Sequence, residues 1–178
     1  MNAAQLYLES IRKQFNNYKS LGDNCFTQLS EEELNLAPAP GSNSIAIIVR
    51  HMHGNLLSRF TNFLTEDGEK PWRQRDQEFS EDQPMRPSQL LQLWNEAWTC
   101  LFNTLDALQP DDLTKTVTIR TEPHSALDAI NRQLAHHASH VGQIILIAKM
   151  YKQANWQSLS IPKGESRSFN EKMAQKHG

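Results

Sequence analysis

The stretch SIAIIVRHMHGNLLSRFTNFLTE, residues 44–66, indicates the fold class of this chain of 178 residues. Its apolar side chains recur at three- and four-residue spacing, which is the period of one buried face of an α-helix. Ser44 stands at the start of the stretch, where its hydroxyl can cap the first turn. The apolar face consists of Ile45, Ile48, Val49, Met52, Leu56, Phe60 and Phe63.

The helical period continues on both sides of this stretch. It predicts further helices at about residues 3–29, 88–108 and 125–152. Residues 67–87 connect the second helix to the third and contain four prolines and glycines. A connection of this length can return the chain along the bundle, so that the second and third helices run parallel. The pattern therefore predicts an all-α four-helix bundle with one long crossover.

Smaller elements are predicted where the helical period is interrupted. Ser30 and Glu33 form a capping-box pattern, which favours a short helical turn. β-branched residues alternate over Lys115–Arg120, which favours a small β-hairpin between the third and fourth helices. Ser88 is placed to cap the third helix. The segment Trp156–Pro162 is expected to pack back onto the bundle.

Composition narrows the class of protein. The chain has 18 basic and 20 acidic residues, a net charge of −2, and 38% hydrophobic residues. Its length predicts one domain over residues 1–178. The near-neutral charge argues against a nucleic-acid partner. No apolar run approaches the ~20 residues that a bilayer requires, and the N-terminus lacks the features of a signal peptide. We expect a cytoplasmic protein with neither nucleic acid nor membrane as partner.

Five of the seven histidines fall in two groups, one in each of two predicted helices. His51 and His53 lie in the second helix, and His136, His137 and His140 lie in the fourth. Side chains four residues apart share a helix face at about 5–6 Å between Cβ atoms, and histidines so placed can bind one metal ion. A third imidazole from a neighbouring helix would give a three-histidine site with an open coordination position, typical of catalytic metals.

The spacing alone leaves the choice of ligands open. Projected at 100° per residue, the apolar stripe of the fourth helix centres near His137, while His136 and His140 lie toward its edge. His137 with His140 is therefore a second possible pair. His51 and His53 fall on opposite edges of the stripe of their helix, so they are not expected to bind one ion together. All five could also be core-edge residues bonded to the backbone, since His-x-x-x-His without glutamate is a weak motif.

The two histidine segments resemble a known family. The second helix reads SIAIIVRHM over residues 44–52, and the fourth reads HHASHVGQI over residues 136–144. An isolated histidine followed by His-x-x-x-His-x-Gly-Gln resembles the DinB-like superfamily of bacterial four-helix proteins, also called YfiT-like metal-dependent hydrolases. The resemblance covers nearly the whole chain, including the long crossover. It implies His51, His136 and His140 as ligands of a divalent metal cofactor, zinc or nickel.

The resemblance also implies roles for other residues and a class of reaction. It leaves His53 as a surface residue and His137 as a packed, hydrogen-bonded one. Characterised members include transferases that use low-molecular-weight thiols and an isomerase that uses mycothiol. A thiol activated at the metal and transferred to an electrophilic small molecule is therefore the leading expectation. Hydrolysis at the same site, or a non-catalytic metal-binding stress-response protein, is the alternative.

Three polar residues near the histidines are candidates for catalysis. Arg59 falls within the apolar stripe of its helix, where pairing with a carboxylate is favoured over recognition of an anionic substrate. Asn55 lies one turn beyond His51, and Gln143 lies near the ligands of the fourth helix.

Gly142 destabilises the fourth helix by about 1 kcal/mol relative to alanine. Something should offset this cost, and we expect close approach of a neighbouring backbone to do so.

Substrate contacts and assembly are the last expectations. Trp72, Arg73 and Arg75 of the crossover could hold a substrate carboxylate or phosphate, because arginine binds such groups through two hydrogen bonds. The alternative is a crossover that packs its tryptophan and solvates its charges. No carboxylate can be assigned as a general base.

A homodimer is also predicted. One core is not expected to hide all the large aromatic residues of the third helix, and leftover aromatic surface usually marks an interface. These residues are Trp94, Trp98 and Phe102.

Overall fold

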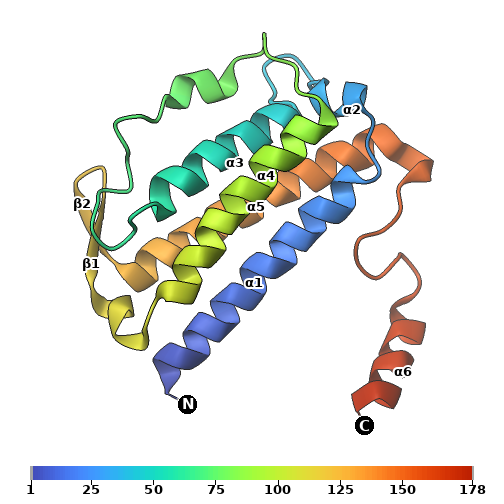
Figure 1. The fold of residues 1–178 in the computed structure, drawn as a ribbon. Helices are drawn as coiled ribbons and strands as arrows, with labels where there is room; N and C mark the ends of the chain where they lie inside the picture. The colour runs from blue at the N-terminus through green and yellow to red at the C-terminus, as the bar shows by residue number, and fades with distance from the viewer. Residues whose placement is uncertain (1, 178) are drawn as a thin grey trace.

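The computed structural model describes residues 2–177, and this part of the chain contains six α-helices and one two-stranded hairpin. α3 and α4 run parallel to each other and antiparallel to α1 and α5 (Figure 1). This arrangement confirms the predicted four-helix bundle with its long crossover. The long helices are α1 (Ala3–Phe26), α3 (Ile45–Phe60), α4 (Pro87–Ala107) and α5 (Ala126–Lys152).

The helix ends are set by side-chain caps, some of them predicted. The Ser44 side chain accepts a hydrogen bond from the backbone N–H of Ile47 at the start of α3. α3 ends at Phe60, earlier than expected, because Thr61 is extended and Asn62 has a positive φ of 50°. α4 begins before Ser88, which lies inside the helix, so the prediction that Ser88 is the cap is wrong.

Shorter helices occupy the connections. α2 (Glu31–Asn35) begins with the predicted capping box, in which Glu33 N–H donates to the Ser30 hydroxyl and Ser30 N–H donates to the Glu33 carboxylate. The crossover carries a short 3₁₀ helix, η1 (Arg75–Phe79), which packs against α3. The 3₁₀ helices are η1 (Arg75–Phe79), η2 (Pro110–Thr114) and η3 (Gln153–Asn155).

The core is filled by aromatic residues of α4 that pack against α1. Trp94 and Trp98 are 1% and 0% exposed. The ring of Phe26 meets Trp94 edge-on with centroids 5.1 Å apart, and Phe15 meets Trp98 in the same way at 6.2 Å. Phe102 is half-buried and stacks on Trp98. The bundle therefore hides the two tryptophans that suggested an interface, and the homodimer stays a prediction without that support.

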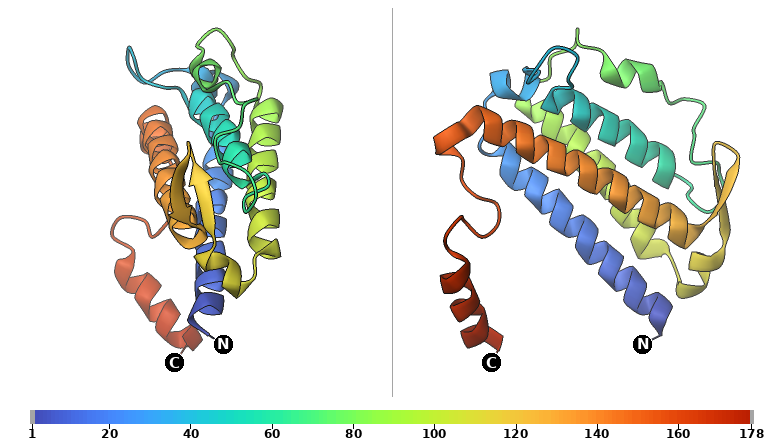
Figure 2. Two further views of the ribbon diagram at one scale, coloured as in Figure 1. Left: turned by 90° about the vertical axis from the view of Figure 1, so that its left-hand side faces the viewer. Right: turned by 180° about the vertical axis from the view of Figure 1, so that it is seen from behind.

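The predicted hairpin closes one end of the bundle. β1 (Thr116–Ile119) pairs with β2 (Glu122–Ser125) in antiparallel register, and the two strands lie at the end of α5 (Figure 2). Gly68 N–H, at the start of the crossover, donates to the carbonyl of Thr118 at 2.8 Å. The hairpin and the crossover are therefore held together where both approach α3.

The C-terminal part of the chain leaves the bundle. Trp156 and Leu159 pack partly against the core, in agreement with the expectation for this segment. The chain then forms α6 (Ser166–His177), which lies to one side of the four long helices (Figures 1 and 2). The sequence did not predict α6, because its residues carry no strong apolar period. Among residues 2–177, no helix is long and apolar enough to cross a membrane.

Candidate metal centre

Three histidine rings from two helices converge on one point. His51 projects from α3, and His136 and His140 project from successive turns of α5; each offers a nitrogen within 4.8 Å of the other two. The Nε2 atoms of His51 and His136 are 3.3 Å apart. Two nitrogens that each lie about 2.0–2.1 Å from a tetrahedral zinc ion are about 3.3 Å apart. The cluster therefore fits a single small divalent ion.

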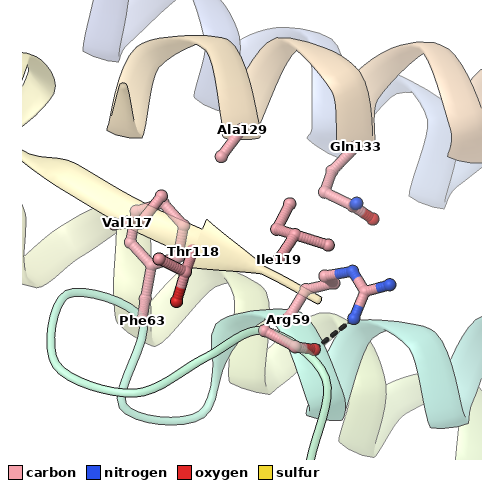
Figure 3. A pocket seen from close by; sticks show the side chains of 8 residues that line it. Arg59, Phe63, Val117, Thr118, Ile119, Ala129 and Gln133 are labelled. Atoms are coloured by element: carbon pink, nitrogen blue, oxygen red, sulfur yellow. Dashed lines mark hydrogen bonds between the residues drawn. The ribbon is translucent and has the colours of Figure 1, made fainter. Parts of the chain in front are cut away.

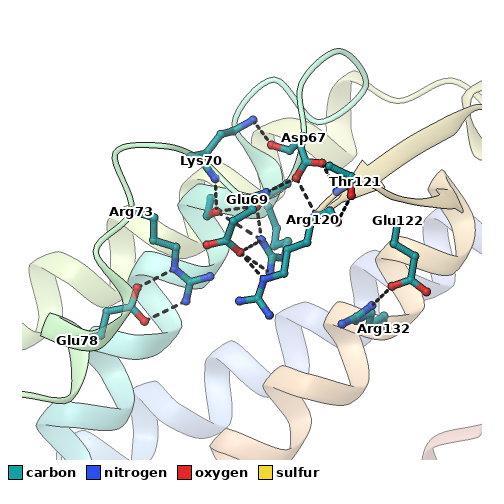
Figure 4. Close-up of polar contacts among 12 residues, drawn as sticks. Asp67, Glu69, Lys70, Arg73, Glu78, Arg120, Thr121, Glu122 and Arg132 are labelled. Carbon is teal, nitrogen blue, oxygen red and sulfur yellow. Dashed lines mark hydrogen bonds and ion pairs between the residues drawn. The ribbon is translucent and has the colours of Figure 1, made fainter.

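A buried carboxylate orients the first of these rings. Nδ1 of His51 lies 2.9 Å from Oε2 of Glu78, which belongs to η1. When Nδ1–H donates to this carboxylate, Nε2 carries the lone pair that faces the other two rings. Glu78 also accepts two hydrogen bonds from Arg73, at 2.7 and 2.9 Å (Figure 4). The crossover thus supplies the carboxylate that sequence reasoning could not identify.

The charge of Glu78 is maintained by these partners. Burial alone would raise the pKa of its carboxyl group, but hydrogen bonds from His51 and Arg73 outweigh burial and lower that pKa below its ordinary value. Arg73, a predicted substrate contact, has a side chain only 2% exposed, with Nε and Nη2 engaged by Glu78. Its main contact in this structure is therefore with Glu78, and the role of Arg73 as a substrate contact stays a prediction.

A glycine on α3 makes room for the carboxylate. A Cβ atom built on Gly54 would lie 2.1 Å from Oε1 of Glu78, which is far inside van der Waals contact. No residue other than glycine therefore fits there without displacing Glu78. Gly142 behaves differently, because a Cβ atom on it would meet nothing within 4 Å. The prediction that a neighbouring backbone approaches Gly142 is wrong.

The two candidate ligands on α5 are kept neutral and partly oriented. Nδ1 of His140 lies 3.2 Å from the side-chain oxygen of Gln143, so that an Nδ1–H donor leaves Nε2 free. Burial, together with the nearby rings of His140 and His51, lowers the pKa of His136 to about 4. Burial and His51 also lower the pKa of His140. Neutral imidazoles are the form that binds a metal ion.

The remaining two histidines lie outside the cluster. His53 is half-buried, and its Nε2 lies 3.3 Å from a carboxylate oxygen of Glu96. His137 is 0% exposed, with its ring centroid 6.0 Å from that of Trp98. Within residues 2–177, neither ring nitrogen of His137 has a hydrogen-bond partner. His137 is therefore packed as predicted, but the prediction that it is hydrogen-bonded is wrong.

A cavity of about 220 Å³ opens beside the cluster, next to His51 and His136. Asn55 lines it, as the sequence suggested, and so does Gln133 of α5. Trp72, also a predicted substrate contact, is 53% exposed and does not belong to the lining. Sequence reasoning missed Gln133, because nothing in its local pattern marks it. The basic residues of the lining are Arg59, Arg73, Arg75, Arg120 and Arg132.

Arg59 holds the start of the crossover in place. Its Nη1 donates to the carbonyl of Gly68, and both terminal nitrogens lie 3.3 Å from a carboxylate oxygen of Glu69. The favoured structural pairing of Arg59 is therefore present.

A second, smaller cavity of about 10 Å³ lies next to Arg59, between Gln133 and apolar residues of the hairpin, among them Ile119 (Figure 3). That volume corresponds to about one water molecule.

Comparison with known proteins places this chain beside one family. The family described as protein of unknown function (DUF1572) matches residues 2–165. The match spans all four long helices and ends one residue before α6 begins. None of the curated proteins matches the sequence.

Proposed function

This chain belongs to the DUF1572 family of proteins of unknown function, and we propose that it is a divalent-metal-dependent enzyme with His51, His136 and His140 as ligands. The observation that carries this proposal is the convergence of three rings beside a cavity. Three protein ligands with free space next to them are typical of catalytic zinc, whereas structural zinc is enclosed by four. The resemblance to the DinB-like superfamily supports the same conclusion.

The reaction that we propose is transfer of a low-molecular-weight thiol to an electrophilic small molecule. A bound zinc or nickel ion would supply a Lewis acid that lowers the pKa of a thiol toward neutrality. Glu78 and Gln143 keep the rings of His51 and His140 in the tautomer that exposes Nε2. Asn55 borders the same cavity and can hydrogen-bond the acceptor.

Hydrolysis at this site is the second candidate. The cavity is bordered by exposed arginines, so water can enter it, and a bound divalent ion activates water by the same electrostatic effect. A non-catalytic metal-binding protein would need no space beside its ligands. The cavity next to His51 and His136 therefore favours an enzyme over that alternative.

Metal content tests the proposal. Untagged protein should bind one equivalent of zinc or nickel in a competition titration, as checked by elemental analysis. His136→Ala and His140→Ala should each lose stoichiometric binding while helicity stays unchanged by circular dichroism. His53→Ala is the matched control, because His53 lies on α3 two residues from His51 but outside the cluster. One equivalent of metal retained by His136→Ala would overturn the ligand assignment.

Activity separates the two reactions. The metal-loaded protein should consume a small thiol in the presence of an electrophile, and the rate should fall to background after chelation or in His140→Ala. Ester or amide hydrolysis without thiol consumption would replace transfer by the second candidate. Stoichiometric metal binding with neither activity, across panels of both substrate types, would favour the non-catalytic protein.

A further inference from the structure

We infer that the cavity beside the histidine cluster takes an anionic small molecule, held through a carboxylate or phosphate group by the guanidinium groups of Arg75 and Arg132. This inference rests on the proposed function for the role of the ligand as substrate. The binding itself is independent of the metal. The inference rests on the residues that line the cavity. Among the residues that the structure describes, five arginines belong to this lining, and no aspartate or glutamate does.

The arginines reach the cavity from segments that are far apart in the sequence. Arg59 comes from α3, Arg73 and Arg75 from the crossover, Arg120 from the hairpin and Arg132 from α5. The whole chain carries a net charge of only −2, so such a concentration of one sign does not follow from composition. A concave site lined by one sign of charge attracts ligands of the opposite sign.

Carboxylates outside the lining neutralise part of this charge. Glu69 accepts hydrogen bonds from Arg59 and from Arg120, the latter at 3.0 Å, and Glu78 binds Arg73 (Figure 4). One carboxylate thus serves two of these guanidinium groups. The pairing holds Arg59, Arg73 and Arg120 in fixed positions, but it leaves the cavity positive.

Two arginines of the lining have no close carboxylate partner. Within residues 2–177, Arg75 forms no ion pair, and its guanidinium carbon lies 5.3 Å from the ring centroid of Phe79. Arg132 approaches Glu122 only to 4.0 Å, with both side chains at least half exposed, so this contact is weak. Arg75 and Arg132 are therefore the groups best able to bind a carboxylate or phosphate bidentately.

Buried neutral groups complete a polar site. Asn55 and Gln133 are 6% and 4% exposed, and the side-chain oxygen of each lacks a hydrogen-bond partner in the described chain. Rotation of either carboxamide can present its NH₂ group to an anion instead. The volume of about 220 Å³ lies below the roughly 300–1,000 Å³ of sites for drug-sized ligands. The cavity therefore suits a small anion, or the anionic end of a larger molecule.

Calorimetry on the metal-free full chain tests the inference with two probes, inorganic phosphate and succinate. At least one should bind saturably with a stoichiometry of one. Arg75→Gln and Arg132→Gln should each weaken that binding about tenfold. Both residues are exposed, and the thermal unfolding midpoint of each variant checks that the fold is intact. The probe that binds more tightly shows whether the natural group is a phosphate or a carboxylate.

The matched control is Arg167→Gln. Arg167 lies on α6, away from the cavity, is 93% exposed and pairs with Glu171 at 3.0 Å. Its replacement removes the same charge but should leave the affinity unchanged. Equal weakening by Arg167→Gln, or no binding of either probe, would overturn the inference.

The same titrations keep this inference apart from the proposed function. Anion binding by a chain that takes up no zinc or nickel would refute the metal site and leave the anion site standing. Stoichiometric metal binding without anion binding would refute the anion site and leave the metal site standing. His140→Ala should lose the metal and keep phosphate or succinate, because His140 belongs to the histidine cluster but does not line the cavity, where the proposed contacts are made by guanidinium groups.

Discussion

At the scale of single residues, the histidine cluster depends on contacts that its own helices do not make. Glu78 comes from the crossover, yet it accepts the Nδ1 proton of His51 and pairs with Arg73. A carboxylate in this position fixes the tautomer of a ligand and raises its basicity. The crossover predicted at residues 67–87 therefore contributes Glu78 to the candidate site.

Glu78→Gln is expected to weaken zinc binding by about 10–100-fold, the usual effect of losing a partner of a metal-ligating histidine. The amide keeps the size of the side chain but removes the charge that His51 and Arg73 share. A competition titration against a chelator measures the change. Glu81→Gln, an exposed position in the same crossover, should leave the affinity unchanged. An unchanged affinity for Glu78→Gln would show that this carboxylate does not tune the site.

At the scale of elements, two helix glycines have opposite surroundings. Gly54 of α3 faces the carboxylate of Glu78, and Gly142 of α5 is exposed with free space around its Cα. Alanine stabilises a helix by about 1 kcal/mol relative to glycine where its methyl group fits. Only the second position offers that gain without cost.

Gly142→Ala should therefore raise the free energy of unfolding by about 1 kcal/mol and leave zinc affinity unchanged. Gly54→Ala should lower zinc affinity, because its methyl group displaces Glu78 from His51. Urea denaturation and the competition titration measure the two effects. A loss of metal from Gly142→Ala but not from Gly54→Ala would contradict this account.

The hairpin is attached to the crossover by one carboxylate. Asp67 accepts hydrogen bonds from the backbone N–H groups of Glu69, Arg120 and Thr121, at 2.7, 2.9 and 2.8 Å. Arg120 and Thr121 have φ values of 55° and 66°. This left-handed backbone conformation is unfavourable for residues other than glycine. The hydrogen bonds of Asp67 help to hold this turn and, with it, the position of Arg120 at the cavity.

Acid should weaken this attachment. Burial alone would raise the pKa of Asp67, but backbone hydrogen bonds from Glu69, Thr121 and Arg120 lower it far below the ordinary value of about 3.9. The unfolded chain therefore binds a proton more readily, and the stabilisation present above about pH 4 is lost as the pH falls through the folded-state pKa.

Asp67→Asn is expected to lower the free energy of unfolding by about 1 kcal/mol at pH 7. It should also flatten the dependence of that free energy on pH below about pH 4, because the titrating group is gone. Urea denaturation from pH 2 to pH 7 measures both effects. Asp82→Asn, at an exposed position of the crossover, serves as the control. Parallel pH profiles for Asp67→Asn and the unmodified chain would refute the role of Asp67.

At the scale of the whole molecule, stability is expected to reside in the four long helices and the segment that packs on them. Most core side chains come from α1, α3, α4 and α5 with the hairpin, and Trp156 and Leu159 pack partly against them. α6 contributes no buried residue among those whose side chains are described, and Phe169 and Met173 are 42% and 40% exposed. The family match also ends before α6.

A chain that ends at Lys163 should therefore unfold with a free energy within about 0.5 kcal/mol of the full chain, as surface changes do. Trp156→Ala should cost about 1–2 kcal/mol, because it removes a half-buried aromatic contact with the core. Urea denaturation of the three proteins provides the comparison. A large loss of stability on removing α6 would show that this helix docks on the bundle in solution.

Local patterns in the sequence determined the secondary structure of this protein. Apolar periods predicted the four long helices, the caps at Ser30 and Ser44 lie where the pattern placed them, and alternation over Lys115–Arg120 predicted the hairpin. These features depend on interactions between residues at most four or five positions apart, which a linear pattern records. α6 escaped prediction because its residues carry no strong apolar period.

Only the tertiary structure decided the surroundings of the histidines. Periodicity left His136 and His137 as alternatives, and the packing of α5 turns the first toward His51 and buries the second. Glu78 meets His51 across 27 positions of sequence. The arginines of the cavity come together from α3, the crossover, the hairpin and α5. Such contacts depend on how distant segments are oriented in three dimensions, and no local period in the chain encodes that orientation.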